Sequence, residues 1–160
     1  MAYQMQADGM EEISEILSKL EDEAPGIAAR GLYEGAGVMA DAIKREAANI
    51  KTAPFKYAKS GSTRLPSPEE KEIVMQAAAG IARFNKNGAE VDTSVGFQNA
   101  GYAQLKNKTV PVPVVVNAIN SGTSFMEKQP FVRKAEKAGR AKAMQAMKAS
   151  IEKDFDAITK

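Results

Sequence analysis

Few side chains in this sequence could do chemistry, because two of the commonest catalytic and metal-binding residue types are missing. The chain contains no Cys and no His, which removes thiolate nucleophiles, the commonest general base and the commonest transition-metal ligand. Glu69 and Glu70 form a carboxylate pair, but they stand at an expected helix start, where negative charge is favoured without any catalytic role. We therefore expect that the protein is not an enzyme and has neither a cofactor nor a metal site.

The sequence GAGVMA at residues 35–40 fits the G-x-G-x-x-A pattern that binds dinucleotides. That pattern needs a strand before it and a helix after it, whereas both flanks here indicate one continuous helix. Gly31 and Gly35 lie one helical turn apart, so one flank of that helix is nearly bare. We expect this flank to pack closely on a neighbouring helix rather than to bind a nucleotide.

Basic side chains alternate with aromatic ones in the long segment 51–66. Such a combination can contact phosphates and stack on nucleic-acid bases. Lys56, Lys59 and Arg64 are therefore candidate DNA contacts. The alternative is a solvated loop that Phe55 and Tyr57 anchor, although the segment exceeds the usual length of a connection, which favours an interaction role.

Charge is distributed unevenly, although the formal net charge is only +2. Residues 1–23 carry seven acids and one Lys, whereas residues 128–160 carry nine bases and four acids. Such polarity can be satisfied within one chain, or it can support head-to-tail contact between copies. The basic surface of the last helix is either a solvated face or a surface that meets an acidic partner.

Length and composition favour a single domain over residues 1–160. A hydrophobic content of 44% permits a core, and the scarcity of aromatic residues favours Ala- and Met-rich helices in close contact. No apolar run approaches the roughly 18 residues of a membrane span. The N-terminus also lacks the pattern of a signal peptide, so we expect no membrane partner.

A short strand and two helices are expected in the first third of the chain. Polar and apolar residues alternate over 3–7, which predicts a half-buried strand. Asp8 is a good N-cap for the helix that follows. Pro25 and Gly26 either end that helix or begin the next one, which is expected to run to about Lys51.

One helix and one strand are expected in the middle of the chain. Ser67 and Glu70 form a capping box at the start of a helix that extends to Phe84. Alternating Val and Thr over 89–97 predict a strand.

Three further segments show weaker patterns. Residues 52–66 and 98–111 are expected to be flexible loops. The Val-rich segment 112–120 leaves two alternatives open, because β-branched residues favour a strand whereas Pro113 could begin a short helix.

The segment NSGTSFMEKQPFVRKAEKAG, residues 120–139, joins a turn to the start of a long last helix. Gly122 permits a turn with positive φ, and the hydroxyl of Thr123 can form local hydrogen bonds. Pro130 sets the first helical φ, and Phe131 is expected to hold the helix start in the core. A loop that is held at both ends keeps its tip in a defined place, which suits an interface.

The order of these motifs resembles the tail-completion, or head–tail joining, family of long-tailed phages. The resemblance spans nearly the whole chain, and its most specific part is Gly122-Thr123 followed by Pro130-Phe131 and the last helix. It implies an α+β fold in which long helices, including a long C-terminal one, pack on a small antiparallel sheet. It also favours the helix over 112–120.

The resemblance further implies a structural virion protein of the neck or tail end, assembled in the bacterial cytoplasm as a ring of copies, commonly six. Neighbouring neck, adaptor or tail-tube proteins would be its partners, and an acidic helix of one subunit would face the basic last helix of the next. Lys56, Lys59 and Arg64 would line a channel for DNA. A small, sequence-independent nucleic-acid-binding module is the alternative, which the acidic N-terminus disfavours. The interface residues are Gly122, Thr123, Pro130, Phe131, Lys134, Lys137 and Arg140.

Overall fold

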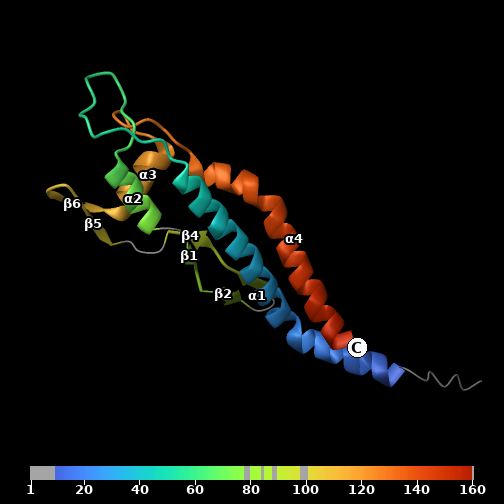
Figure 1. Ribbon diagram of the computed structural model, residues 1–160. Coiled ribbons are helices and arrows are strands. Elements are labelled where there is room, and N and C mark those ends of the chain that lie inside the picture. Colours follow the sequence, from blue (N-terminus) through green and yellow to red (C-terminus); the bar gives the residue numbers. More distant parts are fainter. Residues whose placement is uncertain (1–9, 78–79, 84, 88–89, 98–100, 160) are drawn as a thin grey trace, which may run out of the picture.

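A computed structural model describes residues 10–77, 80–83, 85–87, 90–97 and 101–159. The expected α+β fold is confirmed, with a long helix near each end of the chain (Figure 1). Instead of one small sheet, the described residues form three separate two-stranded antiparallel sheets. The helices are α1 (Met10–Ala48), α2 (Pro68–Gln76), α3 (Val112–Ser121) and α4 (Phe131–Thr159).

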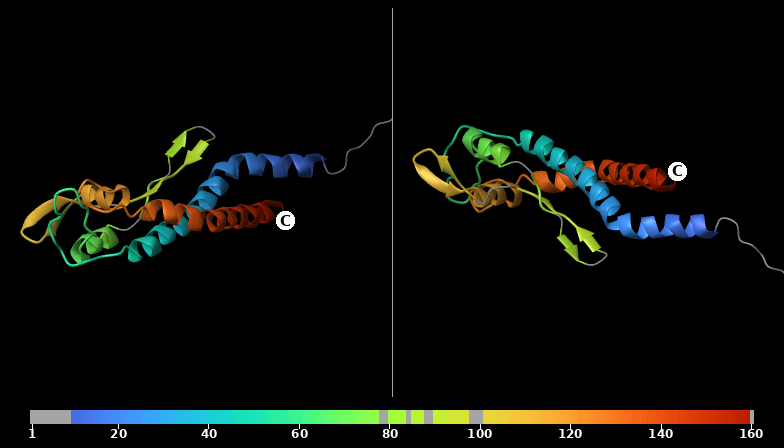
Figure 2. Two further views of the ribbon diagram at one scale, coloured as in Figure 1. Left: turned by 90° about the horizontal axis from the view of Figure 1, so that it is seen from above. Right: turned by 90° about the horizontal axis from the view of Figure 1, so that it is seen from below.

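Helices α1 and α4 pack side by side as an antiparallel pair, and the glycines of α1 set how closely they approach (Figures 1 and 2). A Cβ atom added to Gly35 would lie 2.6 Å from Sδ of Met147 and 3.3 Å from the carbonyl oxygen of Ala143. A Cβ atom on Gly31 would lie 2.8 Å from Cγ1 of Ile151. The expected close packing is therefore confirmed, and residues 35–40 lie inside one continuous helix, with helical residues directly before them.

The expectation that Pro25 and Gly26 separate two helices is wrong, because α1 continues through both residues. Proline lacks an N–H group and its ring clashes with the preceding turn, so an interior proline bends a helix. Figure 2 shows that the first part of α1 runs in a different direction from the rest and extends past the end of α4. We call residues 10–24 the arm. The strand expected over 3–7 and the cap at Asp8 lie outside the described residues.

Helix α2 begins with the predicted capping box. The backbone N–H of Glu70 donates to Oγ of Ser67 at 3.2 Å, and the backbone N–H of Ser67 donates to Oε2 of Glu70 at 2.8 Å. However, the helix ends at Gln76 rather than at Phe84, which itself is not described.

One short strand lies within the second half of that expected helix, and three more follow it. Strand β1 (Gly80–Ile81) pairs with β4 (Val95–Gly96), and β2 (Asn85–Asn87) pairs with β3 (Glu90–Asp92). The alternation expected over 89–97 is confirmed at Val91, Thr93 and Val95, which are half-buried while the residues between them are exposed. The segment nevertheless forms two short strands in different sheets rather than the one strand expected. Pairing with β4 outweighs the helix propensity of the alanine-rich segment, because tertiary context overrides local preference.

The segment expected as a flexible loop over 98–111 contains a hairpin in its described part. Strand β5 (Tyr102–Leu105) pairs with β6 (Lys108–Pro111) through a two-residue connection. Lys106 has a positive φ of 54° in that turn. Residues 52–66, by contrast, form a long connection without a helix or a strand. Residues 112–121 form α3, the helical alternative.

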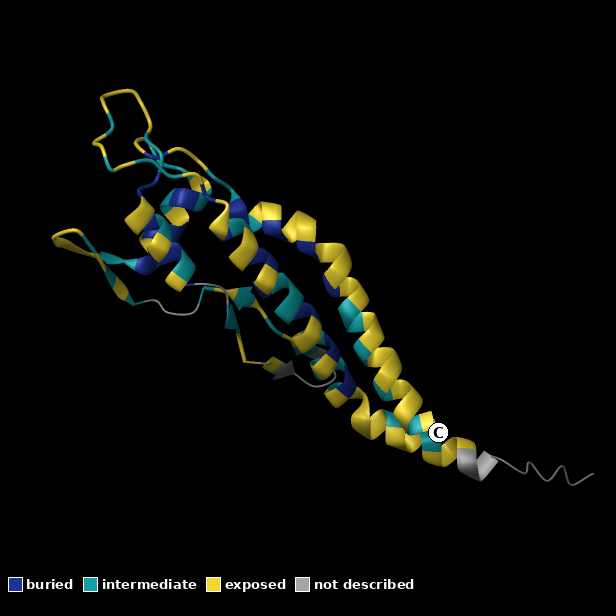
Figure 3. Cartoon of the chain, in the orientation of Figure 1, coloured by how far each residue is buried: buried dark blue, intermediate teal, exposed yellow. Residues whose placement is uncertain are grey.

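The core lies where α2, α3 and the second half of α1 meet the start of α4 (Figure 3). Ile119 and Val74 are completely buried there. Phe131 is 2% exposed and packs edge-on against Phe97, with their ring centroids 5.8 Å apart. Phe131 therefore holds the start of α4 in the core, as the sequence predicted.

Candidate interaction surfaces

The loop between α3 and α4 is held in place by the residues that the sequence analysis singled out. Gly122 has a φ of 76°, and a Cβ atom there would lie 3.1 Å from Cα of Lys128. The hydroxyl of Thr123 accepts hydrogen bonds from the backbone N–H groups of Phe125 and Met126, at 3.3 and 3.0 Å. The positive φ at Gly122 and the local hydrogen bonds of Thr123 are thus confirmed.

These loop residues position the surface rather than forming it. Phe131 is buried, and Gly122 and Thr123 are half-buried and pack within the loop. The assignment of Phe131 to an interface is therefore corrected, because a buried ring cannot reach a partner. Asn120 completes the structure by accepting, through Oδ1, a hydrogen bond from the backbone N–H of Val132 at 3.2 Å. The solvent-facing aromatic residue of this loop is Phe125, 50% exposed, which the sequence analysis missed.

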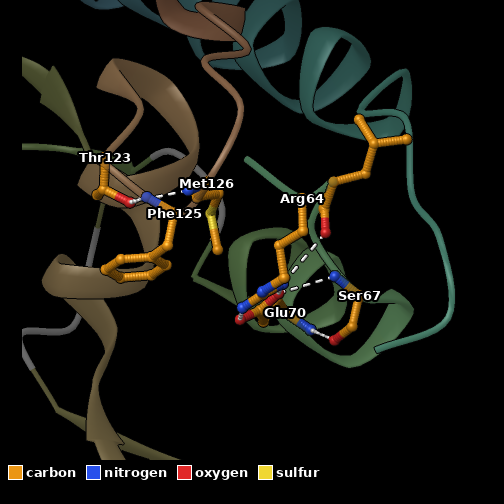
Figure 4. A network of polar contacts seen from close by, with 7 residues as sticks. Arg64, Ser67, Glu70, Thr123, Phe125 and Met126 are labelled. Carbon is orange, nitrogen blue, oxygen red and sulfur yellow. Dashed lines mark hydrogen bonds and ion pairs between the residues drawn. The ribbon is translucent and has the colours of Figure 1, made fainter. Parts of the chain in front are cut away.

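Arg64 joins the loop 52–66 to this second loop and to α2 (Figure 4). Its backbone N–H donates to the carbonyl of Phe125, and its carbonyl accepts from the backbone N–H of Glu127, both at 2.9 Å. Its guanidinium donates to both carboxylate oxygens of Glu70, at 2.7 and 2.6 Å.

The hydrogen bonds from Arg64 to Glu70 raise the pKa of the guanidinium against the opposing effect of burial. The Arg64 side chain is only 13% exposed, and its donors already meet a carboxylate. Its assignment as a DNA contact is therefore corrected: Arg64 is a structural link. Of the candidate DNA contacts, Lys56 and Lys59 remain exposed.

The two aromatic residues of the 52–66 loop have different roles. The Phe55 ring lies between the Arg64 guanidinium, 4.7 Å from its centroid, and Nζ of Lys106, 3.7 Å away. Phe55 thus anchors the loop as expected, by cation–π contact. Tyr57 packs edge-on against Phe55, with ring centroids 5.2 Å apart, but it is 87% exposed and so adds little burial to the anchor. Lys106 was missed, and the signal that could have located it is the short Lys-Asn connection between two alternating runs.

The first half of α4 presents a basic surface. Residues 131–148 carry six bases and one acid, and Lys134, Lys137 and Arg140 are all exposed. Met144, one turn after Arg140, is 61% exposed. The remainder of the helix, residues 149–159, has the opposite sign, with three acids and one base. We call residues 131–148 the basic half of α4.

The arm presents an acidic and partly apolar surface at the other end of the helical pair. It carries six acids and one base, and Ile13 and Leu17, one turn apart, are 58% and 60% exposed. Arg30 of α1 donates to Oδ2 of Asp154 at 2.5 Å, near the end of α4. Among the described side chains, no ion pair joins the arm to the basic half of α4.

Comparison of the chain with protein-family models, with curated proteins and with solved structures found no match. In the described part of the chain, no group of three or more acidic side chains is placed to hold a metal ion. None of the described helices is both long and apolar enough to cross a membrane. Function must therefore be argued from the surfaces of the molecule.

Proposed function

We propose that this protein is a non-enzymatic structural component of a phage virion, which assembles as a ring at the neck or tail end. One observation carries the proposal: two surfaces of opposite charge lie at opposite ends of a single helical pair. The number of copies, commonly six, and the neighbouring neck, adaptor or tail-tube proteins follow from the family resemblance alone.

The arm is too far from Lys134, Lys137 and Arg140 in the basic half of α4 for them to attract each other within one chain. Gly139 of α4 packs against Ala42 of α1, and Leu17 precedes Ala42 by 25 residues. At a rise of 1.5 Å per residue that is about 37 Å along the helix. Charges so far apart are screened at physiological salt, where the Debye length is about 8 Å. The end of α4 that lies nearer to the arm is itself acidic.

Contact between copies would bring the two oppositely charged surfaces together. The arm of one copy would lie on the basic half of α4 in the next, with its acids against Lys134, Lys137 and Arg140. Exposed Leu17 and Met144 would add apolar area to the charge pairing. Because the two surfaces differ, the contact is heterologous, and repeating it produces a closed ring when the rotation between copies closes.

Electron microscopy of the purified protein, together with sizing, tests this proposal. We expect rings with a central opening, and a shift toward monomer in the variant Lys134→Glu/Lys137→Glu/Arg140→Glu. The matched control Lys56→Glu/Lys59→Glu, which reverses charge on the distant loop, should leave the oligomer unchanged. Monomers of the unaltered protein, or rings that persist in the triple variant, would contradict the proposed contact.

Sequence-independent nucleic-acid binding is the second candidate, and the loop 52–66 is the reason for it. Lys56 and Lys59 are exposed on either side of Tyr57, whose ring packs edge-on against Phe55 but is 87% exposed and can stack on a base. In a ring, this loop could meet DNA that passes through the channel. Binding of single-stranded DNA should weaken steeply as salt increases, and Lys56→Ala/Lys59→Ala should reduce the salt dependence. Absence of binding at low salt would rule this candidate out.

A further inference from the structure

A groove of about 640 Å³ separates α2 from β5. One face of α2 forms its helical wall, because the lining residues of this helix recur every three or four positions. Ile73, Ala77 and Val112, all buried, supply apolar lining. Helix α2 has nine residues and β5 has four, so each wall is about 13 Å long. The groove therefore has the length of about four extended residues.

The strand wall has a free edge. In a hairpin with a two-residue connection, the residues next to the turn form a hydrogen-bonded pair, and such pairs alternate along the ladder. Leu105 is that first residue, so the backbone N–H and C=O groups of Tyr102 and Gln104 point away from β6. Both residues line the groove, and no described backbone group outside the hairpin bonds to either.

The helical wall is acidic. Glu69 and Glu72 are exposed and lie at the groove. A hydrogen bond from Ser67, a backbone hydrogen bond and the positive charge of Lys106 together hold the pKa of Glu69 below its usual value. The Glu69 carboxylate can therefore meet a cation at neutral pH, and with the exposed Glu72 beside it the wall disfavours an acidic occupant and favours a basic one.

We propose that this groove binds an extended peptide segment of a partner protein, which adds as a strand to the edge of β5. The peptide backbone bonds to Tyr102 and Gln104, small apolar side chains contact Ile73 and Val112, and Lys or Arg side chains reach Glu69 and Glu72. Strand addition takes affinity from the main chain and specificity from the alternating side chains. The partner segment is thus defined as extended, basic and rich in small apolar residues.

Two synthetic peptides test this proposal: acetyl-Val-Lys-Val-Lys-Val-amide and its counterpart with Glu in place of Lys. In amide NMR spectra of the full chain, the basic peptide should shift the signals of Tyr102, Gln104 and the α2 face, and the acidic one should not. Two N-methylated versions of the basic peptide, methylated at one or the other set of alternate residues, extend this test. One of the two should cause no shifts, because its methyl groups replace the N–H donors that pair with β5.

Protein variants separate the groove from general attraction to negative charge. The variant Glu69→Gln/Glu72→Gln should bind the basic peptide about tenfold more weakly. The control Glu136→Gln/Glu152→Gln, on the exposed surface of α4, should bind it with unchanged affinity. The proposal would be overturned if the basic peptide caused no shifts, or if both peptides bound with equal affinity. Equal loss of peptide affinity in the two protein variants would also overturn it.

Discussion

The guanidinium of Arg64 and the carboxylate of Glu70 form a partly buried, two-point ion pair, with N–O distances of 2.7 and 2.6 Å. The same carboxylate caps the start of α2 by accepting from the backbone N–H of Ser67. The backbone of Arg64 in turn bonds to the loop before α4. Arg64 therefore contacts the start of α2 through its side chain. Through its backbone it joins the loop 52–66 to the loop before α4, which is distant in the sequence.

Removing Arg64 should destabilise the fold strongly. In Arg64→Met, the carboxylate of Glu70, a residue only 4% exposed, loses its cation, and we expect the free energy of unfolding to fall by about 3 kcal/mol. Arg64→Met/Glu70→Gln should lose less, since no buried charge is left unpaired. Chemical denaturation measures both, with Lys59→Met as an exposed control. Equal stability of Arg64→Met and the control would show that the pair contributes little.

Replacing either of two glycines of α1 by alanine should change the stability of the protein, in opposite directions at the two positions. In Gly35→Ala the new Cβ meets Met147 and the carbonyl oxygen of Ala143, and overpacking should destabilise the protein by about 1 kcal/mol. At Gly37 nothing lies within 4 Å of a new Cβ, so Gly37→Ala should stabilise by about 0.5–1 kcal/mol through helix propensity. Thermal unfolding of both variants tests this, and a shift of the same sign in both would contradict the packing described.

Alanine substitutions at Gly122 and Gly61 distinguish the cost of backbone strain from the cost of steric contact, because both residues have a φ of 76°. Gly61→Ala enters open space and should lose only about 1 kcal/mol from the left-handed backbone. Gly122→Ala also meets the backbone of Lys128, so we expect a loss of about 3 kcal/mol. Denaturant titration gives the difference, and similar losses would mean that the loop moves to make room.

Replacing Pro25 should straighten and strengthen the arm. Pro25→Ala restores a backbone donor in the helix interior, and an interior proline costs about 3 kcal/mol of helix stability. Amide hydrogen exchange over residues 13–24 should therefore slow by tenfold or more. The exposed substitution Ser18→Ala serves as a control for general changes in exchange. Unchanged exchange in the arm would show that the bend has another cause.

The carboxyl of Glu69 should titrate below its ordinary pKa of 4.5. The hydrogen bond from Ser67 is the largest cause, so Ser67→Ala should raise the Glu69 pKa toward the ordinary value in carbon-detected NMR titration. Because the folded-state pKa is lowered, the stabilisation by Glu69 is present above about pH 4.5. It is lost as the pH falls through the lower folded-state value. A Glu69 pKa at or above 4.5 would contradict this account.

Local signals in the sequence predicted several parts of the structure correctly. The capping box at Ser67 and the turn at Gly122 each depend on contacts within a few residues, which the sequence displays directly. The close approach of α4 to Gly31 and Gly35 follows from the absence of side chains on one helix face. The start of the long α4 after Pro130 was likewise predicted, because proline fixes a helical φ at a helix start.

Only the tertiary structure decided the features that depend on distant partners. Helix α2 ends early because Ile81 pairs with Val95, and Arg64 is removed from the candidate DNA surface because Glu70 and the loop at Phe125 occupy it. The sequence determined the charge of the two ends. The fold decided that the arm lies too far from Lys134, Lys137 and Arg140 to meet them in one chain, because helices of fixed rise pack antiparallel and place the arm beyond the end of α4.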